Sequence, residues 1–486
     1  ISPVLLAASK GYNDIIEVLQ KNGANLNAND AAGNSAMHLA AAASRLYTLK
    51  NLHAKGVSLE ARNKEYYTPL HLASAQGIPD SVRTLISLGA DTTASASKDD
   101  LLRPIRLAAL NKHWDVTAVF HEMEIPYSFF DAAAYGDLPM LERMLDKDPT
   151  LIMRSAKGHG YDGYLMAIYT NQLEAAEFLL SRGASPVSVS RDGISALGIA
   201  LVQNDKEKMD FVLGRGFPIN HGPTTGRGDA AIHIAAEASE VETLEYLLDK
   251  GANIDLQNKQ GQTALHVAIL KNRLDIAEAL LKRNAAYTIR DNYFYPPLHY
   301  AAREGREEFI HLLLDAGADI NDFGGRPQYR PIHMATINHH PDAIRALIDR
   351  GADLAIFDIR ERTALHYAVE SGNVEISKQL MDAGADFRLR DELGFTPTHI
   401  AVMNGRYSLY LELVRRGANL DAVDDRGRTM LHMAVACPHP KISFHLRELG
   451  ADVNALDNDG RSPLFEAIEG EGRVIIRRII EQDRDL

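Results

Sequence analysis

The stretch DNYFYPPLHYAA, residues 291–302, combines two patterns that favour different structures. Its second half, PLHYAA, predicts the start of a helix. Its first half places Tyr293, Phe294 and Tyr295 side by side after an Asp-Asn pair, where such residues predict a polar turn. The meaning of the three aromatics depends on how often the rest of the stretch recurs along the chain.

The helix-starting element recurs with a period of about 33 residues. The clear copies are NSAMHLAA, YTPLHLAS, DAAIHIAA, QTALHVAI, YPPLHYAA, RPIHMAT, RTALHYAV, FTPTHIAV and RTMLHMAV, with histidines His38, His71, His233, His266, His299, His333, His366, His399 and His432. From His233 onward the steps are 33, 33, 34, 33, 33 and 33 residues. A second signature, G-A-D or G-A-N, follows seven of these nine histidines in phase. Two motifs that recur in phase identify a repeat protein.

Each period predicts a turn, a short helix, a second helix with an apolar pair such as Leu247 and Leu248, and a glycine stop. One such unit cannot bury its apolar face alone, so neighbouring units must stack. Small residues after the histidine, such as Ala301 and Ala302, allow the first helices of neighbouring units to approach closely.

The combined pattern resembles that of the ankyrin repeat family, T-P-L-H-x-A followed by G-A-D. Weaker copies are centred on Leu5, Arg106, Phe130, Leu165 and Gly198. The resemblance implies an all-α solenoid of about fifteen helix-turn-helix repeats with short β-hairpin fingers. It also implies that the nine histidines are structural, because in the family the Thr hydroxyl bonds the ring and holds the turn on the helix.

The array is irregular near residue 126. The step from Arg106 to Phe130 is 24 residues, and HEMEIPY (121–127) replaces the G-A-D element and the finger after it. Ser128 then has the character of an N-cap that opens a new helix. We therefore expect a stack over residues 1–125, a second stack over residues 126–486, and a kink or seam near Pro126.

Composition limits the classes of partner. The net charge is −13 and the pI is about 5.8, the wrong sign for binding phosphates, so we expect no nucleic acid partner. All of this charge falls in residues 127–486, which favours a basic partner or serves solubility alone. No apolar run is long enough for membrane insertion. The single cysteine, Cys437, favours a reducing compartment, and we expect a cytoplasmic or nuclear protein.

No motif indicates catalysis. The chain lacks a phosphate-binding G-x-x-x-x-G-K-[ST] loop, and HEMEI (121–125) lacks the second histidine of a zinc protease. Cys437, His439 and His445 match no standard zinc spacing. We predict no enzyme activity, no cofactor and no metal; a small-molecule or metal site in the irregular region 121–164 is a weaker alternative. The long connections 94–104, 146–163 and 220–229 are candidate contact loops.

The fingers carry the candidate binding residues. Five residues before the motif position the family favours glycine, since the turn requires positive φ there. The glycines that keep this pattern are at positions 33, 160, 193, 228, 261, 394, 427 and 460. Tyr66, Phe294 and Glu361 stand at the same place in other repeats. Either those turns change type, or backbone strain is tolerated there.

Consecutive fingers of a stack lie side by side, so aromatic and arginine side chains at 293–295, 323–329 and 357–362 would form one patch. These residue types dominate interface energetics. The predicted partner-binding residues are Tyr293, Phe294, Tyr295, Phe323, Arg326, Tyr329, Phe357, Arg360, Arg362, Tyr66 and Tyr67. The alternative is that each aromatic packs against its neighbouring finger.

Two functions remain open on this basis. The first is a scaffold that binds a partner protein or peptide through its concave face and finger tips. The second is the regulatory or targeting region of a larger enzyme, toxin, channel or secreted effector. The start within a degenerate repeat without a polar cap favours a processed or truncated product. The sequence does not indicate an oligomeric state.

Overall fold

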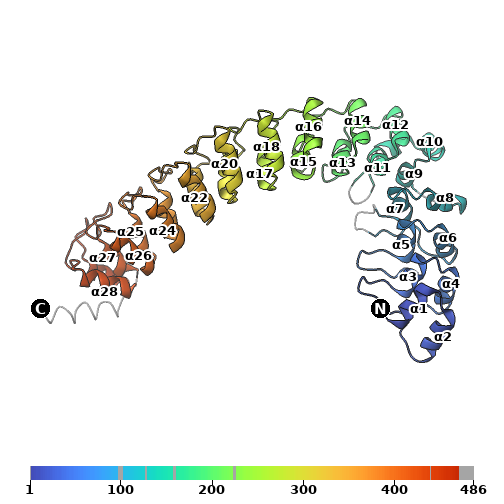
Figure 1. The fold of residues 1–486 in the computed structure, drawn as a ribbon, viewed down its shortest axis with the longest axis horizontal. Helices are drawn as coiled ribbons and strands as arrows, with labels where there is room; N and C mark the ends of the chain where they lie inside the picture. Colours follow the sequence, from blue (N-terminus) through green and yellow to red (C-terminus); the bar gives the residue numbers. More distant parts are fainter. Residues whose placement is uncertain are drawn as a thin grey trace. The chain divides into compact units, whose positions relative to one another are not determined.

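A computed structural model describes residues 2–96, 102–125, 128–156, 160–222, 226–437 and 439–469. Within these ranges the chain forms 29 α-helices and a short 3-10 helix, η1 (Pro149–Met153) (Figure 1). The helices make fourteen pairs, followed by the first helix of a fifteenth repeat. The all-α repeat solenoid predicted from the sequence is confirmed.

The first helix of each repeat is short, and we call it the inner helix. The inner helices are α1 (Pro3–Lys10), α3 (Ala36–Ala42), α5 (Pro69–Ala75), α7 (Pro104–Leu110), α9 (Phe129–Tyr135), α11 (Gly163–Tyr169), α13 (Ala196–Val202), α15 (Ala231–Ala238), α17 (Ala264–Leu270), α19 (Pro297–Arg303), α21 (Pro331–Ile337), α23 (Ala364–Ser371), α25 (Pro397–Met403), α27 (Met430–Ala436) and α29 (Pro463–Glu469).

The second helix of each repeat is the outer helix. The outer helices are α2 (Asn13–Lys21), α4 (Leu46–Ala54), α6 (Pro79–Ser87), α8 (Trp114–Glu122), α10 (Leu138–Lys147), α12 (Leu173–Ser181), α14 (Lys206–Gly214), α16 (Val241–Asp249), α18 (Leu274–Lys282), α20 (Glu307–Asp315), α22 (Pro341–Asp349), α24 (Val374–Asp382), α26 (Tyr407–Arg415) and α28 (Pro440–Glu448).

The sequence explains the packing of each pair. Ala301 and Ala302 of α19 are fully buried, and their small side chains let α19 pack directly against α21. Phe309 and Leu313 turn the apolar face of α20 inward, where both are fully buried. The glycine stop works as predicted, since Gly317 after α20 has a φ of 102°.

The chain forms two compact units: residues 1–239 with 246–252, and residues 240–245 with 253–486. In the first unit the inner helices from α1 to α15 pack in sequence order, each against the next. In the second unit the inner helices from α17 to α29 do the same. Each unit therefore builds its core from contacts between neighbouring repeats, as expected for a solenoid.

The irregularity near residue 126 lies within the first unit. Residues 126–127, including Pro126, are outside the described ranges. On either side of them α7 and α9 pack against each other. Ser128 caps α9 as predicted, because its hydroxyl accepts a hydrogen bond from the backbone N–H of Asp131 at 3.3 Å. The division into stacks 1–125 and 126–486 stays a prediction.

The structure corrects one motif register. The motif histidine occupies the third position of its inner helix, as His71 does in α5. In α9 that position belongs to Asp131, not to Phe130. The alignment failed there because both phenylalanines of SFFDAAA match the apolar position before the histidine.

The fingers between repeats are minimal hairpins. In the described residues they contain isolated antiparallel bridges instead of extended strands. The bridges join Asn29 with Ser35, Ser155 with Asp162, Val189 with Ser195, Gly324 with Tyr329, and Val423 with Thr429. Of the long connections proposed as contact loops, residues 97–101, 157–159 and 223–225 lie outside the described ranges.

Candidate functional site

Each regular finger is folded around one acidic or amide side chain. The Asp291 carboxylate accepts hydrogen bonds from the backbone N–H groups of Tyr293 and Tyr295, both at 2.9 Å. Asp358 holds Arg360 and Arg362 in the same way, at 2.8 and 2.9 Å. This pair of hydrogen bonds fixes the backbone of the finger tip independently of the side chains that the finger tip presents.

The turn type is the same whether or not glycine is present. Gly261 has a φ of 76°, and the corresponding Phe294 has a φ of 67°. Tyr66 and Glu361 are also left-handed, at 63° and 54°. A non-glycine residue in this region costs about 1–2 kcal/mol. The second alternative from the sequence is therefore correct: these fingers keep the turn and accept the strain.

Neighbouring fingers are joined through their backbones. The N–H of Asn292 donates to the Gln260 carbonyl at 2.9 Å, and the N–H of Ile359 donates to the Pro327 carbonyl at 3.0 Å. The same bond follows one finger later, at 3.0 Å, from the N–H of Glu392 to the Arg360 carbonyl. These bonds hold the finger tips of the second unit in a fixed order.

Some of the predicted contact aromatics belong to the packing. Tyr295 packs against His299 with ring centroids 5.7 Å apart and the ring planes tilted by 40°, and Tyr329 lies 6.2 Å from His333 in the same manner. A Cβ at Gly324 would come within 2.6 Å of the Tyr295 ring, so glycine in the next finger makes room for that ring. Tyr295 and Tyr329 are half-buried.

Other predicted residues do face solvent. The exposed fractions are 67% for Tyr293, 61% for Phe294, 49% for Phe323 and 38% for Phe357. Arg326 and Arg360 are exposed as well. Arg362 is not, since its side chain is only 14% exposed and bonds Glu370 at 2.9 Å and Asp391 at 3.2 Å.

Arg290 connects the two most aromatic fingers. Its guanidinium donates to the carbonyls of Phe294 and Phe323, at 3.2 Å for Phe294, and forms an ion pair with Asp322 at 2.7 Å. It also lies 4.9 Å from the centre of the Phe323 ring, while Arg330 lies 5.4 Å from the same ring. Two cations thus lie against the Phe323 ring, and part of its surface stays open to solvent.

Sequence reasoning missed two exposed aliphatic residues in the same row of fingers. Ile359 is 58% exposed and Leu393 is 53% exposed, although both occupy polar positions of the finger tip in most repeats. The sequence could have revealed them, because an apolar residue at a position that is polar in most repeats is a sign of an exposed contact residue. We define the finger row as Tyr293, Phe294, Phe323, Phe357, Ile359 and Leu393.

The first unit repeats part of this arrangement. Tyr66 is 65% exposed, and Tyr67 stacks on His71 with centroids 5.9 Å apart. Arg62 donates to the Tyr66 carbonyl at 3.4 Å and to the Ser95 carbonyl at 2.8 Å, as Arg290 does for Phe294 and Phe323. Both aromatic left-handed turns therefore have an arginine that ties them to the next finger.

The motif histidines are structural, as expected from the resemblance. The Thr363 backbone N–H donates to Nδ1 of His366 at 3.1 Å, so the ring carries its proton on Nε2, which donates to the Phe395 carbonyl of the next repeat at 3.1 Å. Burial lowers the pKa of His366 to about 4, because water no longer stabilises the charged ring. The ring of His366 thus holds its own turn and the next finger.

His299 lacks half of this arrangement. Pro296 stands where Thr363 stands in the later repeat and offers neither a hydroxyl nor an N–H group. The Nδ1 atom of His299 is buried without a hydrogen-bond partner, while its Nε2 bonds the Tyr329 carbonyl at 2.8 Å. Pro296 therefore removes a bond that the later repeat makes to its histidine ring.

The histidines considered as metal ligands form hydrogen bonds to the neighbouring repeat. His439 bonds the Met403 carbonyl at 2.9 Å, and His445 bonds the Tyr410 hydroxyl at 3.0 Å, so neither is aimed at Cys437. Among the described residues, no group of three or more metal-binding side chains is assembled.

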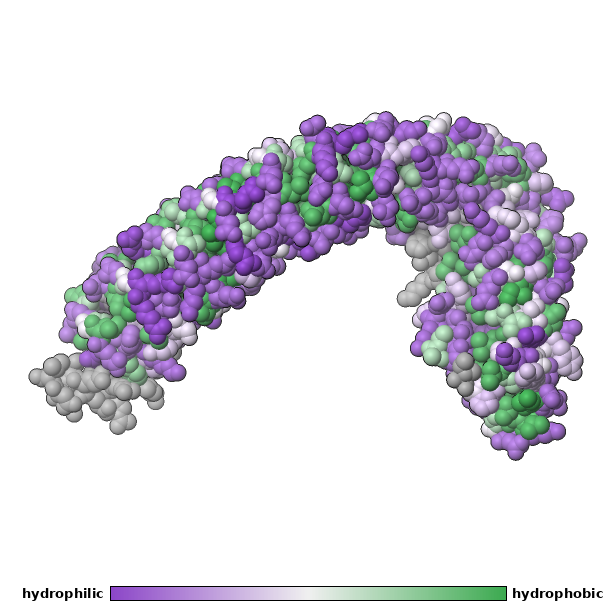
Figure 2. Space-filling view, in the orientation of Figure 1, coloured by the Kyte–Doolittle hydropathy of each residue, from purple (hydrophilic) through white to green (hydrophobic). Residues whose placement is uncertain are grey.

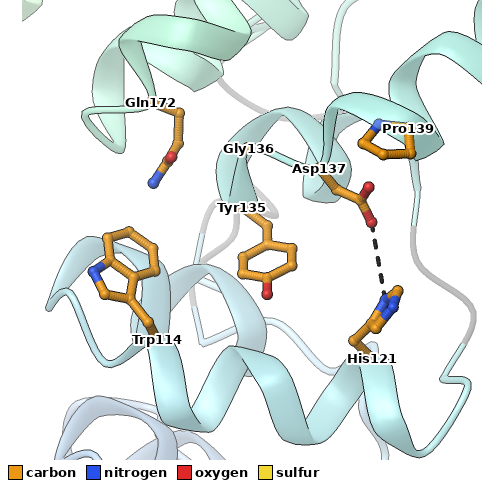
Figure 3. A pocket seen from close by; sticks show the side chains of 7 residues that line it. All are labelled: Trp114, His121, Tyr135, Gly136, Asp137, Pro139 and Gln172. Atoms are coloured by element: carbon orange, nitrogen blue, oxygen red, sulfur yellow. Dashed lines mark ion pairs between the residues drawn. The ribbon is translucent and has the colours of Figure 1, made fainter.

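The irregular region contains an open hollow of about 440 Å³ beside α8 (Figure 3). The rings of Trp114 and Tyr135 face this space, and His121 and Asp137 lie at its other end, 4.0 Å apart. The hollow includes part of the region 121–164 that the sequence suggested for a small molecule, but the groups that line it do not form a metal site.

Comparison with known families identifies the fold. A profile described as ankyrin repeats in three copies matches residues 4–96, 203–291, 232–324, 298–391, 332–424, 378–457 and 398–486. The chain belongs to the ankyrin repeat family. The matches leave residues 97–202 uncovered, where Arg106, Asp131, Leu165 and Gly198 occupy the histidine position.

Several curated proteins are similar over part of their length. The human transient receptor potential cation channel subfamily A member 1 is 30% identical over 130 residues, 27% of this chain and 12% of the channel. Mouse protein phosphatase 1 regulatory subunit 27 is 48% identical over 70 residues, 14% of this chain and 46% of the relative. The Arabidopsis thaliana E3 ubiquitin-protein ligase KEG is 23% identical over 265 residues, 53% of this chain and 15% of the ligase.

The chain thus spans less than half the length of each of these relatives. The three relatives differ in function, and what they share with this chain is the repeat array. On the face shown in Figure 2, hydrophilic side chains predominate and hydrophobic patches interrupt them along the helices. None of the helices in the described ranges is both long and apolar enough to cross a bilayer.

Proposed function

We propose that the chain is a protein-binding scaffold and that the finger row docks a partner protein or peptide. Repeat solenoids bind partners over extended surfaces, and ankyrin repeats in general mediate protein–protein interaction. The observation that carries the proposal is the exposure of six large apolar side chains on consecutive fingers of one unit. Single exposed apolar residues are common, but a contiguous row indicates an interaction site.

Rigidity supports this assignment. The Asp291 and Asp358 turns and the bonds between neighbouring fingers fix the backbone beneath the row. A surface already held in its binding conformation loses little entropy when a partner docks. The strained φ of Phe294 adds to the argument, because a cost of about 1–2 kcal/mol presents an aromatic ring to solvent where glycine would suffice.

The test is a binding measurement on a partner identified by proximity labelling with the full-length protein. Replacing Tyr293→Ala together with Phe294→Gly is expected to weaken binding at least tenfold, or about 1.4 kcal/mol, without lowering Tm. Glu361→Gly is the matched control, since it removes the same left-handed strain without removing an aromatic ring. Equal affinity of the double variant and the wild type would show that the aromatics do not contact the partner.

A second candidate is a regulatory or targeting region within a larger protein. This candidate is favoured by the small part of each relative that the match covers, 12% of the channel and 15% of the ligase. Sequencing the full reading frame separates the two candidates, because an adjoining catalytic or membrane segment would favour the second. The finger row would then recognise either a separate partner or another part of the same protein.

The remaining partner predictions follow from charge. The net charge of −13 favours a partner other than nucleic acid, and a cytoplasmic or nuclear location fits the single cysteine. A filter-binding assay with duplex DNA at low salt tests the first point, and retention of DNA would contradict it.

A further inference from the structure

A second hollow, of about 450 Å³, opens between the fingers and inner helices of two repeats in the first unit. Gly198 lies at its base. Ile194 and Gly193 come from one finger, Gly228 comes from the next, and Val202 and Ile234 come from α13 and α15. The hollow contains neither the finger row nor any of the predicted partner-binding residues.

The hollow lies where other repeats place two rings. In the repeat of His299, the histidine bonds the next finger and the Tyr295 ring packs against it at a centroid distance of 5.7 Å. Tyr329 with His333, and Phe395 with His399, form the same pair. Here the two positions hold Ile194 and Gly198, so both rings are missing. The repeat keeps its cap, since Ser195 accepts a hydrogen bond from the Gly198 N–H at 3.1 Å.

The walls of the hollow are apolar and partly open. Val202 is 66% exposed at its edge, and Ile194 and Ile234 face it as branched aliphatic side chains. Gly193, Gly226 and Gly228 have no Cβ, so a flat group can approach the backbone of both fingers closely. The volume of the hollow falls within the range of about 300–1,000 Å³ for ligand pockets.

The charged residues that line the hollow favour an occupant with basic groups beside it. Arg227 forms ion pairs with Asp229 at 2.7 Å and with Glu237, so its charge is already compensated. Asp192 adds a further carboxylate, and the four charged lining residues carry a net charge of −2. A cationic group beside the occupant is therefore attracted electrostatically.

We propose that this hollow receives an aromatic side chain of a partner polypeptide, flanked by lysine or arginine. The incoming ring takes the place that the tyrosine and histidine rings occupy elsewhere, and the net negative charge of the lining residues attracts the flanking cations. The proposal rests on the proposed protein-binding function and names the partner chemistry for the first unit, whereas the finger row belongs to the second.

The test uses fluorescein-labelled nonapeptides of glycine and lysine with Phe, Leu, Ala or Glu at the centre, and fluorescence anisotropy with the full chain. The Phe peptide is expected to bind at least tenfold more tightly than the Ala peptide. The double variant Ile194→Tyr with Gly198→His rebuilds the ring pair of the His299 repeat and should abolish that preference. Gly214→His is the matched control, because a side chain there meets open space and the preference should persist.

Val202→Lys provides a second variant in case the double variant does not fold. Val202 is mostly exposed, so lysine there leaves the core intact and should reduce the Phe preference at least fivefold. Equal binding of the Phe and Ala peptides to the wild type, or an unchanged preference in the filled variant, overturns the proposal. The Tyr293→Ala, Phe294→Gly variant should keep the preference, so failure of the finger row and failure of the hollow are distinguishable.

Discussion

The repeats with the motif histidine and the repeats over residues 102–202 use the same helices but different links between repeats. In the first group, rings such as His366 bond their own turn and the carbonyl of the next finger. In the second group, Arg106, Asp131, Leu165 and Gly198 occupy that position. The inner helices α9, α11 and α13 keep a side-chain cap, from Ser128, Asp162 and Ser195, whereas α7 has none. The ring that joins one repeat to the next is lost in all four.

Each replacement has a separate consequence. Arg106 and Asp131 form an ion pair at 2.6 Å with both side chains almost fully buried. Gly198 leaves a hollow on the finger side of α13. The comparison teaches that an ankyrin-type stack tolerates loss of the histidine. At Arg106 and Asp131 a buried ion pair stands in its place, and at Gly198 the surface opens into a hollow.

The largest expected effect comes from breaking the buried ion pair. Asp131→Asn leaves Arg106 charged and uncompensated in the interior, which typically costs about 3–5 kcal/mol. The measurement is urea unfolding followed by the fluorescence of Trp114, the single tryptophan, which lies in α8 between the two residues in sequence.

The exposed pair of Arg83 and Glu122 supplies the control. Their side chains are 49% and 56% exposed, so Glu122→Gln should change stability by less than about 1 kcal/mol. Replacing both buried partners, Arg106→Met with Asp131→Leu, removes the uncompensated charge but also the bonds that Ser128 donates to Asp131, so it should restore only part of the lost stability. A loss for Asp131→Asn no larger than for Glu122→Gln would show that the buried pair does not replace the histidine link.

The next effect is a pH dependence confined to the histidine repeats. Burial lowers the pKa values of His299, His333 and His366 to about 4, against about 6.5 in the unfolded chain. As the pH falls below 6.5 the unfolded state binds protons that the folded state refuses, so stability is lost between pH 6.5 and 4. The loss at pH 5 is on the order of 1–2 kcal/mol for each histidine.

Two spectroscopic signals of urea unfolding test whether stability falls with pH and where in the chain it falls. The urea midpoint measured by far-ultraviolet circular dichroism, which reports all helices, should fall between pH 7.5 and pH 5. The midpoint from Trp114 fluorescence should fall less, because its repeat carries Arg106 instead of histidine. A larger fall in the fluorescence signal would contradict the assignment of the pH dependence to the histidine rings.

Much of this architecture was predictable from the sequence because the repeat is local. The recurrence around His299 is sufficient to place helices, glycine stops and the buried ring, and the cap at Ser128 followed from one residue. The register at Asp131 was not predictable, because two adjacent phenylalanines satisfy the same pattern. The carboxylate that replaces the ring is recognised only once Arg106 lies beside it.

The candidate site was predictable only in part. The sequence suggested the same role for Tyr293 and Tyr295, but their environments differ. Tyr293 faces solvent, whereas the Tyr295 ring packs against His299. Their difference depends on Gly324 in the next finger, which no local pattern reveals. The hollow at Gly198 was equally hidden, because the absence of a side chain has meaning only against the neighbouring finger.

The third prediction completes a histidine repeat that is incomplete. Pro296→Thr places a hydroxyl beside the unpaired Nδ1 of His299, and the backbone already has the conformation of Thr363, with ψ of 167° and 168°. The new bonds should stabilise the second unit by about 1 kcal/mol. Thr363→Pro should cost a similar amount, and both shifts are read from the urea midpoint. An unchanged midpoint for Pro296→Thr would show that the lone Nδ1 carries no penalty.

The smallest effect concerns turn strain in a repeat whose histidine is fully bonded. Glu361 has a φ of 54°, and its turn is held by the Asp358 carboxylate whatever the side chain. Glu361→Gly removes a penalty of about 1–2 kcal/mol but restores the greater freedom of glycine to the unfolded chain, worth about 0.5–1 kcal/mol. The net gain should be a few tenths of a kcal/mol up to about 1, measured by urea unfolding at pH 7.5. A loss of stability would mean that the glutamate makes a compensating contact, and the strain at Phe294 could then no longer be interpreted as a cost accepted for binding.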